Sequence, residues 1–303
     1  MADYLTFENI YQAVMKAVSD SNYTRTDEVK AVCNMIYLSE INQCDDLYPL
    51  FWLLDQDTSS KKSKVRAAIT GITAATPPVV SSASHGFVDG DVITIYGAVG
   101  MTDVNGQTYV VKKDSANAYH LHDFAGADVV GAGFTAWSSG GYAYHRGVTL
   151  TDCQSVYKAN WHGYDNGMTP IGPGEVEEQA AWMSENTSRP TRYMHRKVFT
   201  AAGAQEDYLL WYPAADAEYN LRAWLEKHVA RLSVASDVPI GPVQVGDAII
   251  AGSVMRLGQN AVQVEAGVVW PSIYQSNLTA IRTLNRKWWQ QFKQNERSGL
   301  FLP

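Results

Sequence analysis

Residues 69–145 constrain the fold most, because apolar and polar residues alternate along this stretch and turn residues separate the alternating runs. Three runs have the period of two that places successive side chains on opposite faces of a strand: 91–96, 107–112 and 118–124. Asn105-Gly106 separates the first two runs and favours a tight hairpin turn. We therefore predict a closed or nearly closed antiparallel barrel of about 80 residues, which is within the usual size of a domain.

The order of residues in this stretch also resembles a known family. The resemblance is carried by Ser84-His-Gly-Phe87, Asp89-Gly-Asp-Val-Ile-Thr-Ile95 and the run from Gly100 to Tyr109. These runs are similar to the small β-barrel domain first named as part of ubiquitin-activating enzymes, which recurs in phage genomes as an insertion in virion structural proteins. The sequence shows no nucleotide-binding βαβ unit, so the resemblance implies the phage context and not ubiquitin chemistry.

We predict that residues 67–146 are an insertion in a second domain made of residues 1–66 and 147–303. The ends of a closed barrel, near Ala67 and Arg146, are expected to lie close together, so the insertion should be dispensable for folding. The predicted fold class is α+β: a helical bundle with a small antiparallel β-meander, plus an inserted all-β barrel-like domain.

Helices are expected on both sides of the barrel. Apolar residues recur at helical spacing over residues 7–18 and again, after a polar break, over residues 29–41. Residues 245–257 form another helical pattern, with small side chains that let a neighbour approach closely: Ala248, Ala251 and Gly252. Trp270-Pro271 opens the strongest pattern, whose apolar positions are Tyr274, Leu278, Ile281, Leu284, Trp288, Trp289 and Phe292.

The region after the barrel mixes both kinds of pattern. Residues 193–199 and 207–212 predict a β-hairpin, whereas residues 150–161 and 175–185 predict short helices. Residues 219–232 fit a helical stripe and a strand. We favour the strand there, because a third strand would complete a meander and two strands alone are marginally stable.

A second resemblance covers much of residues 147–303 and the helical amino-terminal part. It is carried by Leu209-Leu-Trp-Tyr-Pro-Ala, by Tyr219-Asn-Leu-Arg, by residues 247–257 and by the aromatic and basic helix that follows. These segments are similar to the head-to-tail adaptor proteins of short-tailed phages. The resemblance implies a ring, usually of about twelve subunits, that lies beneath the portal.

Composition limits the function classes. The formal net charge of −7 argues against a chain that mainly grips phosphate backbones, and the cluster Lys61, Lys62 and Lys64 is predicted to be a solvated linker and not a nucleic-acid patch. No apolar run approaches the length of a membrane span, and the first residues lack the features of a signal peptide. The three cysteines form no paired spacing and are predicted to be buried thiols.

No catalytic constellation is found in the sequence, so we predict no enzyme activity, no cofactor and no metal site. His120 and His122 face one side of a predicted strand and could ligate a metal with His85 or Asp123. We favour a pair of exposed barrel histidines instead, because two ligands without a convincing third rarely make a metal site. The stretch Gly131–Ala136 matches a dinucleotide-loop pattern without opening a helix.

Basic and aromatic residues gather at the carboxyl end of the chain, against the overall negative charge. We predict that they form a portal-binding or oligomer interface, or alternatively an ordinary polar helix face: Arg282, Arg286, Lys287, Trp288, Trp289, Phe292, Lys293 and Arg297. Trp289 in particular has two readings, because a partner or the core of the same subunit would each bury it.

Together these features predict a virion structural protein of the phage neck, made in the host cytoplasm, that extends the portal channel and docks the tail. Its expected partners are the portal protein, tail or nozzle proteins and further copies of itself, while DNA passes through the ring without sequence-specific binding. The alternatives are a tail component, such as a tube, fibre or spike protein, and a glycan-active virion enzyme. No membrane association is expected.

Overall fold

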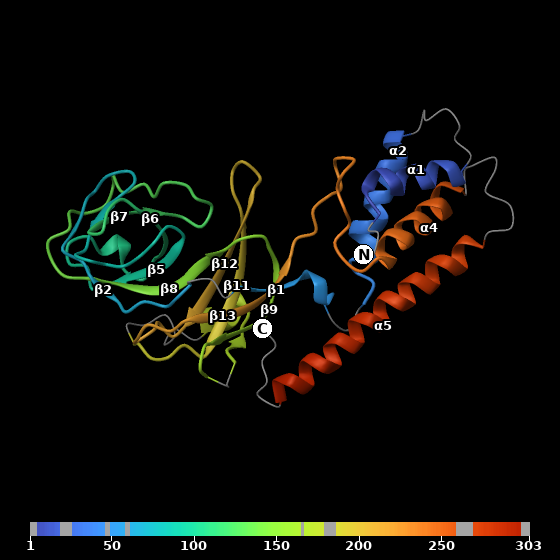
Figure 1. Ribbon diagram of the computed structural model, residues 1–303. Helices are drawn as coiled ribbons and strands as arrows, with labels where there is room; N and C mark the ends of the chain where they lie inside the picture. Colours follow the sequence, from blue (N-terminus) through green and yellow to red (C-terminus); the bar gives the residue numbers. More distant parts are fainter. Residues whose placement is uncertain are drawn as a thin grey trace. The chain divides into compact units, whose positions relative to one another are not determined.

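The computed structural model describes residues 5–18, 26–45, 49–57, 61–164, 167–178, 186–258 and 269–297 (Figure 1). The chain divides into two compact units. Unit 1 contains residues 1–55 and 226–303, and unit 2 contains residues 56–225.

Unit 1 is helical. Its elements are α1 (Phe7–Ala17), α2 (Thr26–Met35), the π-helical continuation η1 (Ile36–Ile41), the 3-10 turn η2 (Phe51–Leu53), α4 (Gln244–Gly258) and α5 (Trp270–Arg297). Each of these four α-helices lies where the sequence pattern predicted a helix. Thr6 caps α1, because its side chain accepts a hydrogen bond from the Asn9 backbone N–H at 3.3 Å. One apolar core joins α1, α2, η1, α4 and α5.

Small residues of α4 allow this close packing. Ala248 and Ala251 are fully buried, and a Cβ on Gly252 would lie 2.9 Å from a ring carbon of Tyr274 in α5. The tight approach of α4 and α5 therefore depends on the absence of a side chain at Gly252. This confirms the predicted role of the small residues.

Unit 2 is dominated by a ten-stranded mixed sheet. Nine strands follow the order β10-β11-β12-β8-β5-β6-β7-β4-β3, and β2 pairs with β8 beside them. The strands are β2 (Ala67–Ala68), β3 (Gly71–Ile72), β4 (Val79–Ser81), β5 (Asp91–Tyr96), β6 (Thr108–Lys113), β7 (Ala118–His122), β8 (Tyr142–Leu150), β10 (Thr169–Pro170), β11 (Arg192–Phe199) and β12 (Gln205–Tyr212). A second sheet has the order β1-β13-β9, with β1 (Leu54–Asp57), β9 (Cys153–Trp161) and β13 (Leu221–Lys227). The short helices η3 (Thr102–Val104) and α3 (Pro173–Glu178) complete this part.

The first and last strands of the series β8-β5-β6-β7-β4 both pair with one short segment of the chain, residues 67–72. Within residues 67–72, β2 pairs with β8, and β3 pairs with β4. The Ile69 N–H donates to the Gly141 carbonyl at 2.9 Å, and the Thr70 N–H donates to the Ser81 carbonyl at 2.8 Å. These strands enclose a core of their own, which includes Phe87, Tyr119 and Leu121.

Strand β8 joins these strands to the rest of unit 2. Its first part pairs with β5 and its last part, from Gly147 to Leu150, also pairs with β12. A further apolar cluster contains residues from both sides of β8, among them Val92, Phe124, Tyr208 and Leu210. The predicted insertion, residues 67–146, thus lies inside one sheet and shares a core with residues that follow it in the chain.

The predicted fold class is wrong. The hairpin of β11 and β12 does not form a small separate meander beside a helical bundle, because β12 pairs with β8 and the strands form one large sheet. The helix predicted for residues 150–161 is also wrong, since β9 occupies Cys153–Trp161. Strand β13 confirms the strand favoured within residues 219–232. The helix predicted for residues 175–185 begins with α3, and residues 179–185 are outside the described part.

Candidate functional site

Helix α5 positions the predicted interface residues in unit 1, and two of its arginines contact the chain near Asp45. Arg282 Nε donates to the Cys44 carbonyl at 2.6 Å. Arg286 Nε lies 3.6 Å from Asp45 Oδ2, which also accepts from Asn285 Nδ2 at 3.0 Å. These two arginines therefore hold residues 44–45 against α5 as well as contributing charge.

Three aromatic side chains near the end of α5 have different environments. Trp289 is 1% exposed, and its Nε1 donates to the Pro49 carbonyl at 2.8 Å. Trp288 is half-buried and stacks between Phe51 and Phe292, with ring centroids 5.4 and 5.0 Å away. The structure therefore places Trp289 in the subunit core and leaves Trp288 and Phe292 partly accessible.

In the sequence, exposed charged residues flank the two stacked aromatic residues of this helix end. Arg286, Lys287 and Lys293 are exposed, whereas the side chain of Arg297 is outside the described residues. We call Trp288, Phe292, Lys287 and Lys293 the α5 end surface. It combines an aromatic area with two ammonium groups, which suits contact with an acidic protein partner.

A comparison with protein-family models finds no match for this chain. No curated protein matches it at a significant level either. The candidate sites therefore rest on their own chemistry. Among the described helices, none combines the length and apolar character that crossing a membrane requires.

Two of the candidate metal ligands, His85 and Asp123, are used in other contacts. His85 is buried, its Nδ1 accepts from the Phe87 N–H at 3.0 Å, and its Nε2 lies 3.1 Å from the Ser115 carbonyl. Asp123 Oδ1 accepts from the backbone N–H groups of Ala125 and Ala127 at the end of a strand. In the part of the chain that is described, no three histidine, cysteine or acidic side chains form a group suited to a metal ion.

Cys153 lies near an imidazole and a carboxylate, but the geometry differs from that of a nucleophilic triad. His195 Nε2 is 3.9 Å from Cys153 Sγ and 2.9 Å from Asp207 Oδ1. In a triad the base uses one ring nitrogen for the nucleophile and the other for the carboxylate. Here the same nitrogen faces both groups and the thiol is fully buried, so we assign Cys153 to the core. Cys33 and Cys44 are also buried thiols, as predicted.

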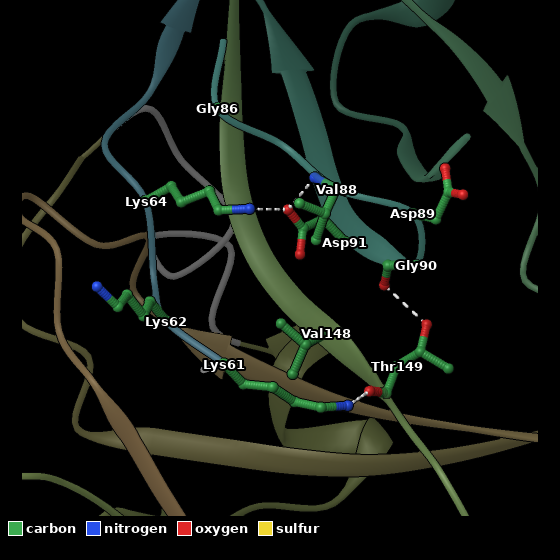
Figure 2. A pocket seen from close by; sticks show the side chains of 10 residues that line it. All are labelled: Lys61, Lys62, Lys64, Gly86, Val88, Asp89, Gly90, Asp91, Val148 and Thr149. Atoms are coloured by element: carbon green, nitrogen blue, oxygen red, sulfur yellow. Dashed lines mark hydrogen bonds and ion pairs between the residues drawn. The ribbon is translucent and has the colours of Figure 1, made fainter. Parts of the chain in front are cut away.

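Unit 2 contains a pocket of about 380 Å³ that the sequence did not predict. Three separate segments line it, and Figure 2 shows their side chains: Lys61, Lys62, Lys64, Gly86, Val88, Asp89, Gly90, Asp91, Val148 and Thr149. Gly90 allows the loop to lie against β8, because a Cβ at this position would lie 2.3 Å from Thr149 Oγ1. Thr149 Oγ1 in turn donates to the Gly90 carbonyl at 2.8 Å.

A buried carboxylate fixes one side of this pocket. Asp91 is 2% exposed, forms an ion pair with Lys64 Nζ and accepts from the Val88 N–H at 2.8 Å. His145 Nε2 lies 3.4 Å from its other oxygen, while His145 Nδ1 accepts from the Lys64 N–H at 2.9 Å. Burial would raise the pKa of Asp91, but His145 and Lys64 outweigh burial and hold that pKa below its ordinary value.

Asp91→Asn tests this network. A lowered carboxyl pKa contributes stability that is present above the unfolded pKa, near 4, and is lost as pH falls through the folded pKa. We expect Asp91→Asn to lower the free energy of unfolding by about 3 kcal/mol at pH 7, the low end of the range for breaking a buried ion pair, since Lys64 keeps some access to water.

Chemical denaturation between pH 7 and pH 3 measures this effect. The difference between wild type and variant should shrink below about pH 4. The exposed Asp114→Asn is the control and should change little at either pH. A difference for Asp91→Asn that is the same at all pH values would show that the carboxylate charge does not stabilise the fold.

The lysine run of residues 61–64 predicted a solvated linker, and no local pattern marks a pocket there. Asp91 and His145 lie 54 positions apart along the chain, and no local pattern relates them. The pairing of β5 with β8 brings them together. Three lysines within four residues were the one available signal.

Proposed function

We propose that this chain is a non-enzymatic virion structural protein, a head-to-tail adaptor that assembles as a ring, extends the portal channel and docks the tail. The observation that carries this proposal is the α5 end surface. Its support from the sequence is the resemblance of residues 147–303 to phage adaptors and of residues 67–146 to a barrel found in virion proteins.

The length of α5 suits a contact at the edge of a subunit. Its 28 residues extend over about 42 Å at 1.5 Å per residue. The buried Tyr274, Leu278 and Ile281 belong to the common core of unit 1, whereas the later residues contact Pro49 and Phe51. The end of the helix thus carries partly buried aromatic side chains, Trp288 and Phe292, and exposed basic ones, Lys287 and Lys293.

A salt-dependent contact with an acidic partner follows from these charges. The portal protein is the proposed partner, and the tail or nozzle proteins and neighbouring copies are the others. The chain as a whole carries a net charge of −7, so DNA would pass an acidic ring without being held.

Charge reversal tests the α5 end surface. We expect Lys287→Glu with Lys293→Glu to weaken portal docking at least tenfold at low salt and less at about 0.5 M salt, because screening shortens the range of charge interactions. Surface plasmon resonance against the portal protein measures the affinity. The melting temperature should stay unchanged, since both side chains are exposed.

The matched control is Lys16→Glu, an exposed lysine in the last turn of α1. Equal weakening by this control would mean that net charge and not the α5 end surface governs docking. Docking of the double variant with wild-type affinity would remove this surface from the interface.

A further inference from the structure

The loop of residues 233–243, which leads into α4 in unit 1, exposes four aliphatic side chains. Val234, Val238, Ile240 and Val243 are between 37% and 56% exposed. Single exposed apolar residues are normal on a protein surface, but four of them on one short loop indicate a contact surface. We call these four residues the loop patch.

Hydrogen bonds hold this loop in one conformation. Asp237 Oδ2 accepts from the Val234 N–H at 2.9 Å, and the Asp237 carbonyl accepts from the Phe7 N–H at 2.6 Å. The Ile240 N–H donates to the Tyr37 hydroxyl at 2.7 Å. Because these bonds fix the loop on the core of unit 1, a partner that binds the loop patch does not have to order it first.

Acidic side chains border the loop patch. Glu8 and Asp247 are exposed in the first turns of α1 and α4. The Glu8 N–H donates to the Ala235 carbonyl of the loop at 3.0 Å, and Asp247 lies in the helix that the loop enters. Residues 231–247 contain two acidic side chains and one basic side chain, Arg231, so with Glu8 this border is acidic overall.

The α5 end surface has the complementary chemistry. Trp288 and Phe292 supply half-buried rings, and Lys287 supplies an exposed ammonium group. Neither Lys287 nor Asp247 forms an ion pair with another residue of the described part of the chain, so each charge can meet a partner. Aromatic side chains are common anchors of protein interfaces, and opposite charges around such an anchor select the partner.

The two surfaces adjoin each other within unit 1. The ring of Phe51 stacks on Trp288 with 5.4 Å between centroids, and a Cβ on Gly241 of the loop would lie 3.1 Å from Nε1 of Trp52. Each copy of the chain therefore presents both halves of a possible contact. Such a chain forms a reciprocal pair when the contact closes on two copies, and a ring when it closes on more.

We propose that the loop patch binds a second copy of this chain through the α5 end surface of that copy. The aliphatic side chains of the loop patch pack against the rings of Trp288 and Phe292, and Lys287 lies among the carboxylates of Glu8 and Asp247. The inference rests on the α5 end surface of the proposed function, but it needs no portal protein.

Sedimentation velocity of the full-length protein alone tests this contact. We expect wild type to self-associate with a Kd of about 10 µM at low salt. Lys287→Glu should weaken the association at least tenfold, and so should Glu8→Lys with Asp247→Lys, because each change brings like charges together. An equimolar mixture of these two proteins should associate like wild type, since reversed charges then face each other across every contact between unlike copies.

Ile240→Asp tests the apolar part of the contact and should also weaken self-association at least tenfold. Its matched control is Val130→Asp, which places the same charge on an exposed aliphatic position of unit 2 and should change nothing. If Ile240→Asp lowers the melting temperature, the mixture of charge variants decides, because Lys287, Glu8 and Asp247 are all exposed.

A wild-type protein that stays monomeric up to about 100 µM would overturn this inference, as would a mixture that associates no better than its components. Portal binding separates the inference from the proposed function. Lys287→Glu that loses portal docking but self-associates like wild type would remove the second copy from this surface and leave the portal as its partner. Restored association of the mixture without any portal binding would support the self-contact and count against the adaptor function.

Discussion

Replacing residues 69–145 by a short Gly/Ser linker is expected to unfold the remainder of unit 2, in contrast to the dispensable insertion expected from the sequence. The deletion removes β5 and the first half of β8, so the part of β8 that pairs with β12, from Gly147 to Leu150, loses its pairing with β5 on the other side. It also removes Val92 and Phe124 from the apolar cluster that contains Tyr208 and Leu210. The sheet thus loses a central strand, and the cluster loses three of its eight buried residues, Val92, Val110 and Phe124, which leaves apolar side chains of β12 without partners.

Near-ultraviolet circular dichroism and proteolysis measure this outcome. We expect the aromatic signal of unit 2 to be lost and residues 150–225 to be cleaved rapidly, while helical signal remains. A deleted protein that keeps a cooperative unfolding transition for residues 150–225 would show that the barrel strands are an independent domain.

A single glycine in β8 gives a smaller test of whether β8 and β12 belong to one continuous sheet. A Cβ on Gly147 in β8 would lie 2.5 Å from the Leu209 carbonyl oxygen of β12, so Gly147→Ala must push the two strands apart. We expect a loss of about 1–3 kcal/mol in unfolding free energy, as for other overpacked sites. Gly133→Ala is the matched control, because a Cβ at Gly133 meets nothing within 4 Å.

Trp289→Ala should lower the unfolding free energy of unit 1 by about 3–5 kcal/mol, the usual cost of truncating a buried large aromatic side chain. The ring is 1% exposed, it packs edge-on to Trp288 and Phe292, and its Nε1 donates to the Pro49 carbonyl. The truncation leaves a cavity and also removes the donor to that carbonyl.

Thermal melting and urea denaturation of the isolated subunit measure this loss. Gln290→Ala is the control, because Gln290 is the exposed neighbour of Trp289 on the same helix. A variant that melts like wild type but fails to dock would mean that a partner, and not the subunit core, buries Trp289.

Local pattern was enough to find most elements of the fold. The alternation of residues 91–96 and 118–124 predicted β5 and β7, and helical spacing predicted α1, α4 and α5. In β7 and α1 the buried residues follow the strand period and the helix period, so the local signal and the tertiary context agree. The glycine and asparagine residues between strands also predicted the reversals.

Two features depended on distant contacts and were predicted wrongly. Residues 150–161 have apolar side chains at helical intervals, but β9 joins β13, which is about 60 positions later in the chain. The fusion of the sheets depends on β8, whose residues pair with β5 on one side and β12 on the other. Register between segments so far apart is set by cross-strand packing, which a single sequence does not display.

In the candidate site, too, the local pattern could not decide which of two neighbouring tryptophans is buried. Trp288 and Trp289 differ by about 100° around the helix axis, and both lie near the edge of the apolar stripe. The Pro49 carbonyl and the ring of Phe51 decide which one is buried. Both partners come from the amino-terminal part of unit 1, so the helical pattern of α5 alone left the two alternatives open.

The mass of the assembled protein tests the proposed adaptor function most directly. Native mass spectrometry or light scattering, on the purified chain alone and mixed with the portal protein, gives the number of copies. We predict a ring of about twelve copies, formed alone or on the portal. A trimer would instead indicate a fibre or spike, and a monomer with glycan-hydrolysing activity that ignores the portal would contradict a structural role altogether.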